Sequence, residues 1–364
     1  MPVRLLAAWL WGWLAASAAT ELGEINGAAF RIDVPDNWNG GLVLYCHGYS
    51  ARPATYKEGP PSPMAKTFLD RGFAVAQSGY AAGGWAVAEA LTDTESLRRY
   101  FVTKYGPPKE TWVTGHSMGG LITVAILEKY PTIYSGGLPL CGVLDGAYRF
   151  FQSVFASAVL FDYYFPGLLP SLVEGKPAGD ARARVKAMVT ALEAEPAKAE
   201  VLRRRDGFKT NEHLATAISG AVGALAELRE RAGGNPFDNQ SLIYTGTLDD
   251  HAVNQNIRRY AADPAATAYV RAYYSPTGQI TKPVLALHTI YDPTVPPAVA
   301  NGYVTKVAEA GNAHLLLQQF VRRDGHCQIS APEIGQAFDE LRAWVRDGQR
   351  PEAGDRTQST PVER

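Results

Sequence analysis

The sequence predicts an α/β fold with a mostly parallel central sheet, helices on both faces of the sheet and a helical segment inserted before the last two strands. Short apolar stretches typical of buried strands alternate with stretches of helical periodicity in residues 20–142, and the alternation resumes in residues 281–346. Between these parts, residues 143–280 are helix-rich and contain no convincing buried strand. We therefore expect one core built from two separated parts, and a helical lid between them.

Composition and charge place the chain among ordinary globular proteins. Of its 364 residues, 46% are hydrophobic and 20% are charged. The formal net charge of -1 argues against nucleic acid or an anionic membrane surface as the main partner. The sequence does not indicate an oligomeric state.

The two ends of the chain differ from the rest. Residues 1–19 carry one cation, then an apolar run that closes on small residues with an A-x-A pattern at 16–18. This pattern predicts a signal peptide and a secreted or periplasmic protein, with an uncleaved anchor as the alternative. No later segment is a transmembrane candidate, so we expect no integral membrane span in the mature protein. Residues 347–364 are polar with Pro and Gly, which predicts a disordered tail.

The individual elements follow from apolar periodicity and from the turn residues between them. Residues 25–34 alternate weakly and predict an edge strand or a hairpin. The remaining predicted strands are 42–46, 73–77, the stretch from Thr111 to the turn at Gly115, 136–142, 283–290 and 315–320. The predicted helices of the core are 64–70, 86–105, the apolar stretch from Ser117 to about Tyr130, 297–310 and 332–345.

The turn after the strand at Thr111 has the sequence Gly115-His-Ser-Met-Gly119. A strand that reverses directly into a helix leaves no room for side chains beside the turn, which explains the two outer glycines. Such a turn exposes the hydroxyl of Ser117 and places the backbone N–H of Met118 at a helix N-terminus. That geometry suits a nucleophile beside a developing oxyanion.

A serine nucleophile needs a base, and the base needs an orienting carboxylate. Asp292 follows the strand at 283–290, in a loop fixed by prolines, and His326 follows the strand at 315–320. Because the carboxyl ends of parallel strands meet at one edge of a sheet, we expect both side chains to converge on Ser117.

These motifs resemble those of the α/β-hydrolases of the serine-esterase type. Gly115-His-Ser-Met-Gly119 is similar to the nucleophile elbow of that family, and His47-Gly48 to its oxyanion-loop motif. Asp292-Pro-Thr-Val-Pro296 and Gly325-His326 are similar to its acid and histidine loops. The resemblance covers about residues 25–142 and 281–346.

The resemblance implies a role for each matching residue. Ser117 would be the nucleophile, His326 the general base and then the general acid, and Asp292 the orienting carboxylate. The backbone N–H groups of Tyr49 and Met118 would form the oxyanion hole. The inserted segment matches no lid of that family that we can name, so the resemblance does not give the substrate.

Other residues compete for these roles. Asp249 and Asp250 lie inside the inserted segment, and Asp324 stands only two residues before His326, so we expect all three acids to be solvated. His116 flanks the nucleophile, with its side chain expected to point away from the hydroxyl as a structural partner.

Two further residues are candidates for the substrate pocket. His47 either orients the oxyanion loop or contacts substrate. Trp85 follows a strand at the catalytic edge and either lines the pocket or only packs. The aromatic run at 150–165 likewise suits either an apolar substrate wall or the core of the lid itself.

The cysteines and histidines do not suggest a metal site. An odd set of cysteines, Cys46, Cys141 and Cys327, allows at most one internal disulfide. Cys141 to Cys327 is a conceivable pair, but the sequence does not choose it. The remaining histidines lack metal-ligand spacing, and no dinucleotide or phosphate loop follows the early strands, so we expect no metal and no cofactor.

Together these observations predict a serine hydrolase that cleaves a small-molecule or polymeric carboxylic ester through an acyl-enzyme on Ser117. The aromatic content of the inserted segment favours an apolar or aromatic group in the substrate. A peptidase or amidase on the same three residues is the nearest alternative, because the sequence does not determine the leaving group. A non-catalytic binding protein of the same fold is the alternative from a different class.

Overall fold

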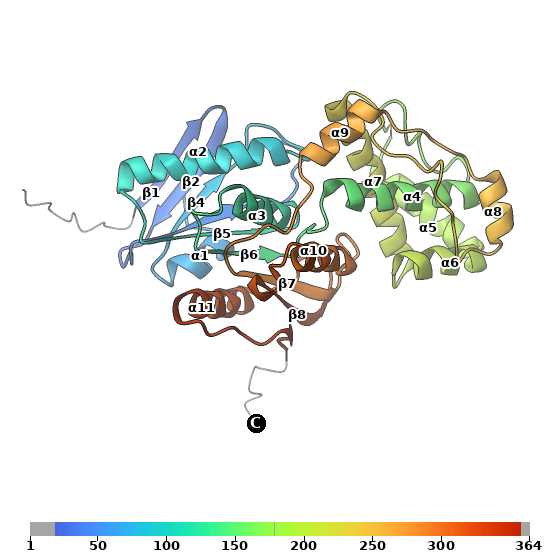
Figure 1. Cartoon of the computed structure of the whole chain (residues 1–364). Helices are drawn as coiled ribbons and strands as arrows, with labels where there is room; N and C mark the ends of the chain where they lie inside the picture. Colours follow the sequence, from blue (N-terminus) through green and yellow to red (C-terminus); the bar gives the residue numbers. More distant parts are fainter. Residues whose placement is uncertain (1–18, 178, 358–364) are drawn as a thin grey trace, which may run out of the picture.

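The computed structural model describes residues 19–177 and 179–357 (Figure 1). The predicted signal peptide lies outside the described residues except for Ala19, and so do residues 358–364 of the predicted tail. Figure 1 shows a sheet with helices on both faces, and a group of helices beyond one end of the strands.

One sheet runs through the core in the order β1-β2-β4-β3-β5-β6-β7-β8-β9. β1 and β2 form an antiparallel hairpin that pairs antiparallel with β4, and all pairs from β4 to β9 are parallel. The strands are β1 (Ala19–Ile25), β2 (Ala28–Val34), β3 (Gly41–Cys46), β4 (Ala74–Ser78), β5 (Glu110–His116), β6 (Gly136–Leu140), β7 (Val284–Tyr291), β8 (Leu316–Asp324) and β9 (Gly354–Asp355). The prediction of a mostly parallel sheet is confirmed.

Helices cover both faces of the sheet because successive strand residues point to opposite faces and both sets are apolar. α1 and α11 pack on the face that carries Val43, Leu285 and Leu317, while α2, α3 and α10 pack on the other. The helices of the core are α1 (Pro63–Leu69), α2 (Val87–Tyr105), α3 (Met118–Lys129), α10 (Ala298–Glu309) and α11 (Ala331–Asp347), and a short 3-10 turn, η1 (Ala313–Leu315), precedes β8.

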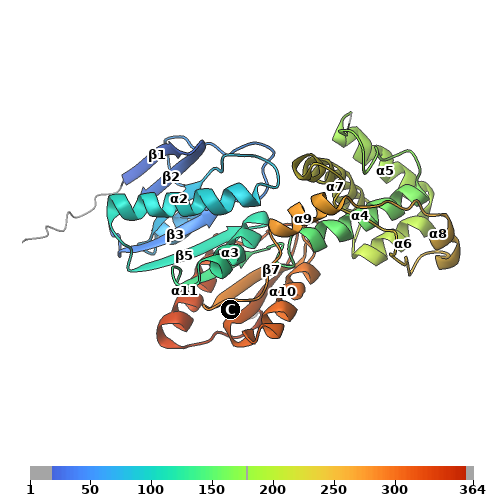
Figure 2. The same cartoon turned by 45° about the horizontal axis from the view of Figure 1, so that its top comes forward.

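The helical insertion, residues 143–280, lies beyond the carboxyl ends of the strands (Figures 1 and 2). Its helices are α4 (Ala147–Tyr164), α5 (Ala181–Ala194), α6 (Pro196–Asp206), α7 (Asn211–Ala232), α8 (Asp250–Asn256) and α9 (Pro264–Ala272). α7 contacts α4, α5, α6 and α9 and is the centre of this group. No helix within residues 19–177 and 179–357 is both long and apolar enough to cross a membrane.

The aromatic residues of the insertion form its own core. Phe155 lies 6.0 Å from Phe237 and 5.7 Å from Tyr260 between ring centroids, and all three side chains are buried. Of the two interpretations that the sequence allowed for the run at 150–165, the structure supports packing inside the insertion. Phe151 reaches the sheet domain, where its ring meets Trp85 edge-on at 4.8 Å.

The prediction of a disordered tail from residue 347 is wrong for the part that the structure describes. α11 continues to Asp347, and β9 pairs with β8 opposite Gln319 and Phe320. The side chain of Gln319 donates to the carbonyl of Glu352 at 2.9 Å, and Arg350 donates to the carbonyl of Leu316 at 3.0 Å. Backbone pairing therefore fixes a segment whose polar composition gave no sign of a strand.

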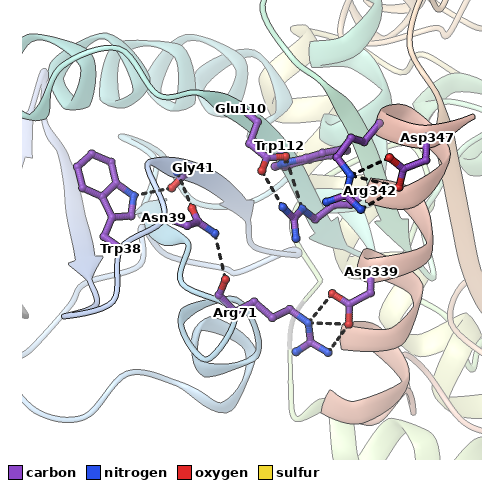
Figure 3. Close-up of polar contacts among 10 residues, drawn as sticks. Trp38, Asn39, Gly41, Arg71, Glu110, Trp112, Asp339, Arg342 and Asp347 are labelled. Carbon is purple, nitrogen blue, oxygen red and sulfur yellow. Dashed lines mark hydrogen bonds and ion pairs between the residues drawn. The ribbon is translucent and has the colours of Figure 1, made fainter.

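Polar contacts tie α11 to the amino-terminal edge of the sheet (Figure 3). Glu110, at the start of β5, accepts hydrogen bonds from Trp112 at 2.8 Å and from Arg342 at 2.8 Å. Arg71, just after α1, forms an ion pair with Asp339 at 2.9 Å. The pairs Arg342–Glu110 and Arg71–Asp339 span 232 and 268 residues of the sequence, so they join the two separated parts of the core.

Replacing Phe338 by Ala should destabilise the protein strongly. Its ring is 1% exposed and meets Phe68, Phe73 and Trp112 edge-on at 5.0–5.5 Å. Removing such a ring leaves a cavity that costs about 3–5 kcal/mol, to be measured by denaturant unfolding. The control is Val304→Ala on α10, where the side chain is 41% exposed, and the change should stay within about 0.5 kcal/mol. Equal losses in both variants would contradict this assignment of the core.

Candidate active site

Ser117 occupies a strained turn between β5 and α3. Its backbone has φ 57° and ψ -121°, a region that residues other than glycine rarely adopt. A side-chain carbon at Gly115 or Gly119 would lie 2.4 Å or 2.0 Å from the carbonyl oxygen of Cys46. Both neighbours must therefore be glycine, and the tight turn holds Ser117 at the carboxyl end of β5.

Asp292 follows β7 directly and is 2% exposed. One carboxylate oxygen lies 2.7 Å from Nδ1 of His326, and the other accepts the backbone N–H groups of Thr294 and Val295 at 2.8 and 2.9 Å. Burial raises the pKa of Asp292, but the hydrogen bonds from His326 and from these N–H groups outweigh it, so its pKa lies below the ordinary value. The carboxylate therefore stays ionised at neutral pH.

The ionised carboxylate determines how His326 can act. Asp292 can only accept a hydrogen bond, so Nδ1 of a neutral His326 carries the proton and Nε2 is the basic atom. The predicted pairing of Asp292 with His326 is present. Ser117 lies at the same edge of the sheet, two strands from β7, and no hydrogen bond joins it to His326 in the described part of the chain. Catalytic hydrogen bonds often tighten only when substrate binds.

A disulfide joins Cys141 to Cys327, one of the pairings that the sequence left open. Cys327 follows His326, and its sulfur lies 3.6 Å from Nε2 of that ring. Cys141 follows β6, whose last residue accepts the backbone N–H of Ser117 at 2.9 Å. The disulfide thus connects the histidine loop to the strand beside the nucleophile.

The remaining cysteine, Cys46, is buried and free, and burial raises the pKa of its thiol to about 12. It is therefore not a nucleophile at neutral pH. Among the described residues, one group of three potential metal ligands lies close together, namely Cys141, His326 and Cys327. Both sulfurs of that group belong to the disulfide, so it offers no thiolate to a metal.

The two predicted oxyanion-hole residues lie at the start of α3 and in the loop after β3. Met118 is the first residue of α3, where backbone N–H groups have no partner within the helix. Tyr49 follows β3, and its side chain is 45% exposed. The next residue, Ser50, forms a bridge with Gly84, whose N–H donates to the Ser50 carbonyl at 2.7 Å. The role of both N–H groups stays a prediction.

His116 supports the loop before Tyr49 instead of reaching the nucleophile. Its Nδ1 lies 2.5 Å from the hydroxyl of Tyr45, and its ring stacks on that of Tyr45. Nε2 lies close enough to Gly48 that a side-chain carbon there would stand at 3.1 Å. Burial, followed by the charges of His326 and His47, lowers the pKa of His116 to about 4.

The two predicted pocket residues are held by other contacts. His47 stacks on Tyr80 with 4.0 Å between ring centroids, and its Nδ1 lies 2.7 Å from the carbonyl of Gly48. These contacts favour an orienting role in the oxyanion loop. Trp85 is 7% exposed and packs against Phe151 of the insertion, which favours packing. Contact of either residue with substrate stays a prediction.

The competing acids have other partners. Asp324 forms an ion pair with Lys209 at 2.6 Å. Asp249 caps α8 by accepting the N–H of Ala252 at 2.9 Å, and Asp250 accepts from the N–H of Thr247 at 2.8 Å. None of these carboxylates shares a hydrogen bond with His326 in the described structure, so Asp292 is the acid that the geometry supports.

The sequence gave no sign of the contacts that hold the insertion to the catalytic loops. The backbone N–H of Lys209 and the ring of His213 bond the hydroxyl of Tyr291, which directly precedes Asp292. On the opposite side, Glu227 and Arg231 bind the loop after β4. The partners stand 78–148 residues apart, and a single sequence carries no signal of such pairing.

A mostly parallel sheet with a strained serine after β5, an acid after β7 and a histidine after β8 defines the class of the α/β-hydrolase fold. The chain belongs to the Tannase-like family of unknown function (DUF6351), which matches residues 26–268. It is a hydrolase of that fold, and the comparisons do not establish its substrate.

Known proteins support this placement. The chain is 23% identical to an o-phthalyl amidase of Xanthobacter agilis, over 91% of this chain and 88% of that protein. It is 28% identical to acetylxylan esterase A of Aspergillus ficuum, over 35% of this chain and 47% of that protein.

Among solved structures, an acylaminoacyl peptidase of Pyrococcus horikoshii superposes with a TM-score of 0.50 at 10% identity. That match covers 92% of this chain but 42% of the peptidase chain, and it shows the fold alone.

Replacing His116 by Gln should make the free energy of unfolding fall less steeply as the pH drops from about 7 to about 4. Its pKa is 6.5 unfolded and about 4 folded, so the folded state binds fewer protons between these values. Stability therefore falls as the pH drops through that window, on the order of 2–3 kcal/mol for this group. Urea unfolding at about pH 7 and about pH 4 should show that the free energy of unfolding falls less in the variant than in the wild type. The variant keeps His47 and His288, whose pKa values burial also lowers, so part of the loss of stability should remain. A loss equal to that of the wild type would contradict the assignment to His116.

Removing the disulfide by Cys141→Ser with Cys327→Ser should lower the melting temperature. The bond closes a segment of 186 residues, and its loss costs about 2–5 kcal/mol. Reductant should lower the melting temperature of the wild type towards that of the double variant, which should not respond to reductant itself. Equal sensitivity of both proteins would show that the disulfide is not what the reductant acts on.

Proposed function

We propose that the protein hydrolyses carboxylic esters through an acyl-enzyme on Ser117. The observation that carries the proposal is the buried Asp292 carboxylate bonded to His326 at the sheet edge where Ser117 stands in its strained turn. In this arrangement Asp292 orients the imidazole and stabilises the imidazolium that forms during the reaction.

The reaction has two halves. Nε2 of His326 takes the hydroxyl proton as Oγ of Ser117 attacks the carbonyl carbon, and the backbone N–H groups of Tyr49 and Met118 receive the oxyanion. His326 then returns the proton to the leaving alcohol as the bond between the carbonyl carbon and that oxygen breaks. Water repeats the attack on the acyl-enzyme, which releases the acid and regenerates Ser117.

An amidase on the same three residues is the second candidate. The relative with the widest coverage is an amidase whose name refers to an o-phthalyl group, and the shorter match is an esterase. The same base and oxyanion donors serve both reactions, since only the leaving atom differs. The o-phthalyl name also supports an aromatic acyl group, which agrees with the expectation from the sequence.

We further propose that the protein works outside the cytoplasm. The Cys141–Cys327 disulfide supports an oxidising compartment, as does the signal peptide predicted from residues 1–19.

Labelling with a fluorophosphonate followed by an ester and amide panel tests the proposal. Ser117→Ala should abolish labelling, and Asp292→Asn should lower kcat/KM by roughly 10³–10⁴-fold because His326 loses its orienting partner. The matched control is Asp249→Asn, which keeps a residue able to cap α8 and should leave kcat/KM within about twofold.

The panel pairs each acyl group as a p-nitrophenyl ester and as an anilide, so the ratio of kcat/KM values ranks ester against amide. A wild-type protein that is neither labelled nor active on any member of the panel would overturn the proposal. Labelling that survives in Ser117→Ala would assign the nucleophile to another residue.

A further inference from the structure

One end of α7 is attached to the catalytic acid loop. The ring nitrogen Nδ1 of His213 lies 2.8 Å from the hydroxyl of Tyr291, the last residue of β7. The same hydroxyl accepts the backbone N–H of Lys209 at 3.0 Å, and the Lys209 ammonium pairs with Asp324 at 2.6 Å. The start of α7 therefore stands at the carboxyl ends of β7 and β8.

The other end of α7 is attached to the loop after β4. Glu227 accepts the backbone N–H of Trp85 at 3.1 Å, and a side-chain carbon at Gly84 would collide with the Glu227 carboxylate at 2.2 Å. Arg231 donates to the carbonyl of Gly83 and forms an ion pair with Glu89 at 3.0 Å. The last turns of α7 therefore stand beside the carboxyl end of β4.

The length of α7 matches the distance that these two attachments must span. His213 and Arg231 are 18 residues apart on one face of α7, which corresponds to about 27 Å of helix, and His213 to Glu227 corresponds to about 21 Å. The strands run in the order β4-β3-β5-β6-β7, and four strand spacings measure about 19 Å. α7 thus crosses the carboxyl ends of these strands from β7 to β4.

The middle strand of this set is β5, which ends at His116, directly before Ser117. Gly220 is midway between His213 and Glu227 along α7, and it lies on the same helix face as His213 and Arg231. Gly220 is exposed, and a side-chain carbon built on it would meet nothing within 4 Å. The next residues along this face, Ala217 and Ala224, are small, uncharged and only partly buried.

We infer that α7 forms a roof over Ser117 and that Gly220 determines how large a group the site accepts beside the scissile carbonyl. The inference rests on the proposed function, because it assigns the size limit to the acyl transfer at Ser117. Open space beside Gly220, bordered by alanines without charge, suits a bulky apolar group such as an aromatic ring. The roof therefore leaves room for an aromatic acyl group.

Two fluorophosphonates that differ only in a methyl or a phenyl group on phosphorus test the roof directly. Oγ of Ser117 displaces fluoride at phosphorus in both and its proton passes to Nε2 of His326, so one O–P bond forms, one P–F bond breaks and the leaving group stays small. In the wild type both probes should label Ser117. Gly220→Leu should slow labelling by the phenyl probe about tenfold or more and change the methyl probe by less than about threefold. Gly220→Ala should give a smaller effect of the same sign.

The matched control is Gly223→Leu. Gly223 lies in the same helix, is exposed and also has nothing within 4 Å of a built side-chain carbon. It is turned about 60° away from Gly220 around the helix axis, so its side chain points to one side of the helix face that carries Gly220. Both substitutions raise helix propensity equally, so melting temperatures should match and only Gly220→Leu should separate the probes.

The outcomes separate this inference from the proposed function. If neither probe labels the wild type at Ser117, the proposed function fails. If both probes label the wild type but Gly220→Leu and Gly223→Leu have the same effect, the inference about Gly220 is wrong. It is also wrong if Gly220→Leu slows labelling by both probes equally. A wild type that reacts with the methyl probe alone also overturns it, because a bulky group then has no room.

Discussion

The hydrogen bond between Asp292 and His326 is the interaction on which the site depends. It joins loops from β7 and β8, and it exists because His326 and two backbone N–H groups hold the Asp292 carboxylate ionised and fixed although the residue is buried. A buried carboxylate without partners would instead be neutral and would fail to set the tautomer of the ring. The site is therefore determined by backbone geometry after β7 as much as by the three side chains.

The strand order brings these loops together. Ser117 follows β5, Asp292 follows β7 and His326 follows β8, and β6 lies between β5 and β7. β6 has a specific part in this arrangement: its last residue accepts the N–H of Ser117, and the cysteine after it is bonded to the residue after His326. The end of β6 thus connects the nucleophile to the histidine loop, through a backbone hydrogen bond with Ser117 and through the disulfide to Cys327.

The features that could be predicted from the sequence are those that depend on residues close together in the chain. The strands, the turn at Ser117 and the loops of Asp292 and His326 each depend on neighbouring residues and on apolar periodicity. The sequence could not predict the disulfide pair, because three cysteines near strand ends fit several pairings. β9 was missed because its two residues are too few to show a periodic apolar pattern, and the anchors of α7 were missed because they join residues far apart in the sequence.

The two anchors of α7 differ in how far their charged groups are buried. Arg231 uses all three guanidinium nitrogens, on Glu227, Glu89 and the carbonyl of Gly83, and its side chain is 17% exposed. The ion pair of Lys209 with Asp324 is more than half exposed on both sides and contributes at most about 1 kcal/mol. The charged contact is therefore the weaker one at the end beside Tyr291, where the hydrogen bonds of the Tyr291 hydroxyl with Lys209 and His213 provide the rest of the attachment.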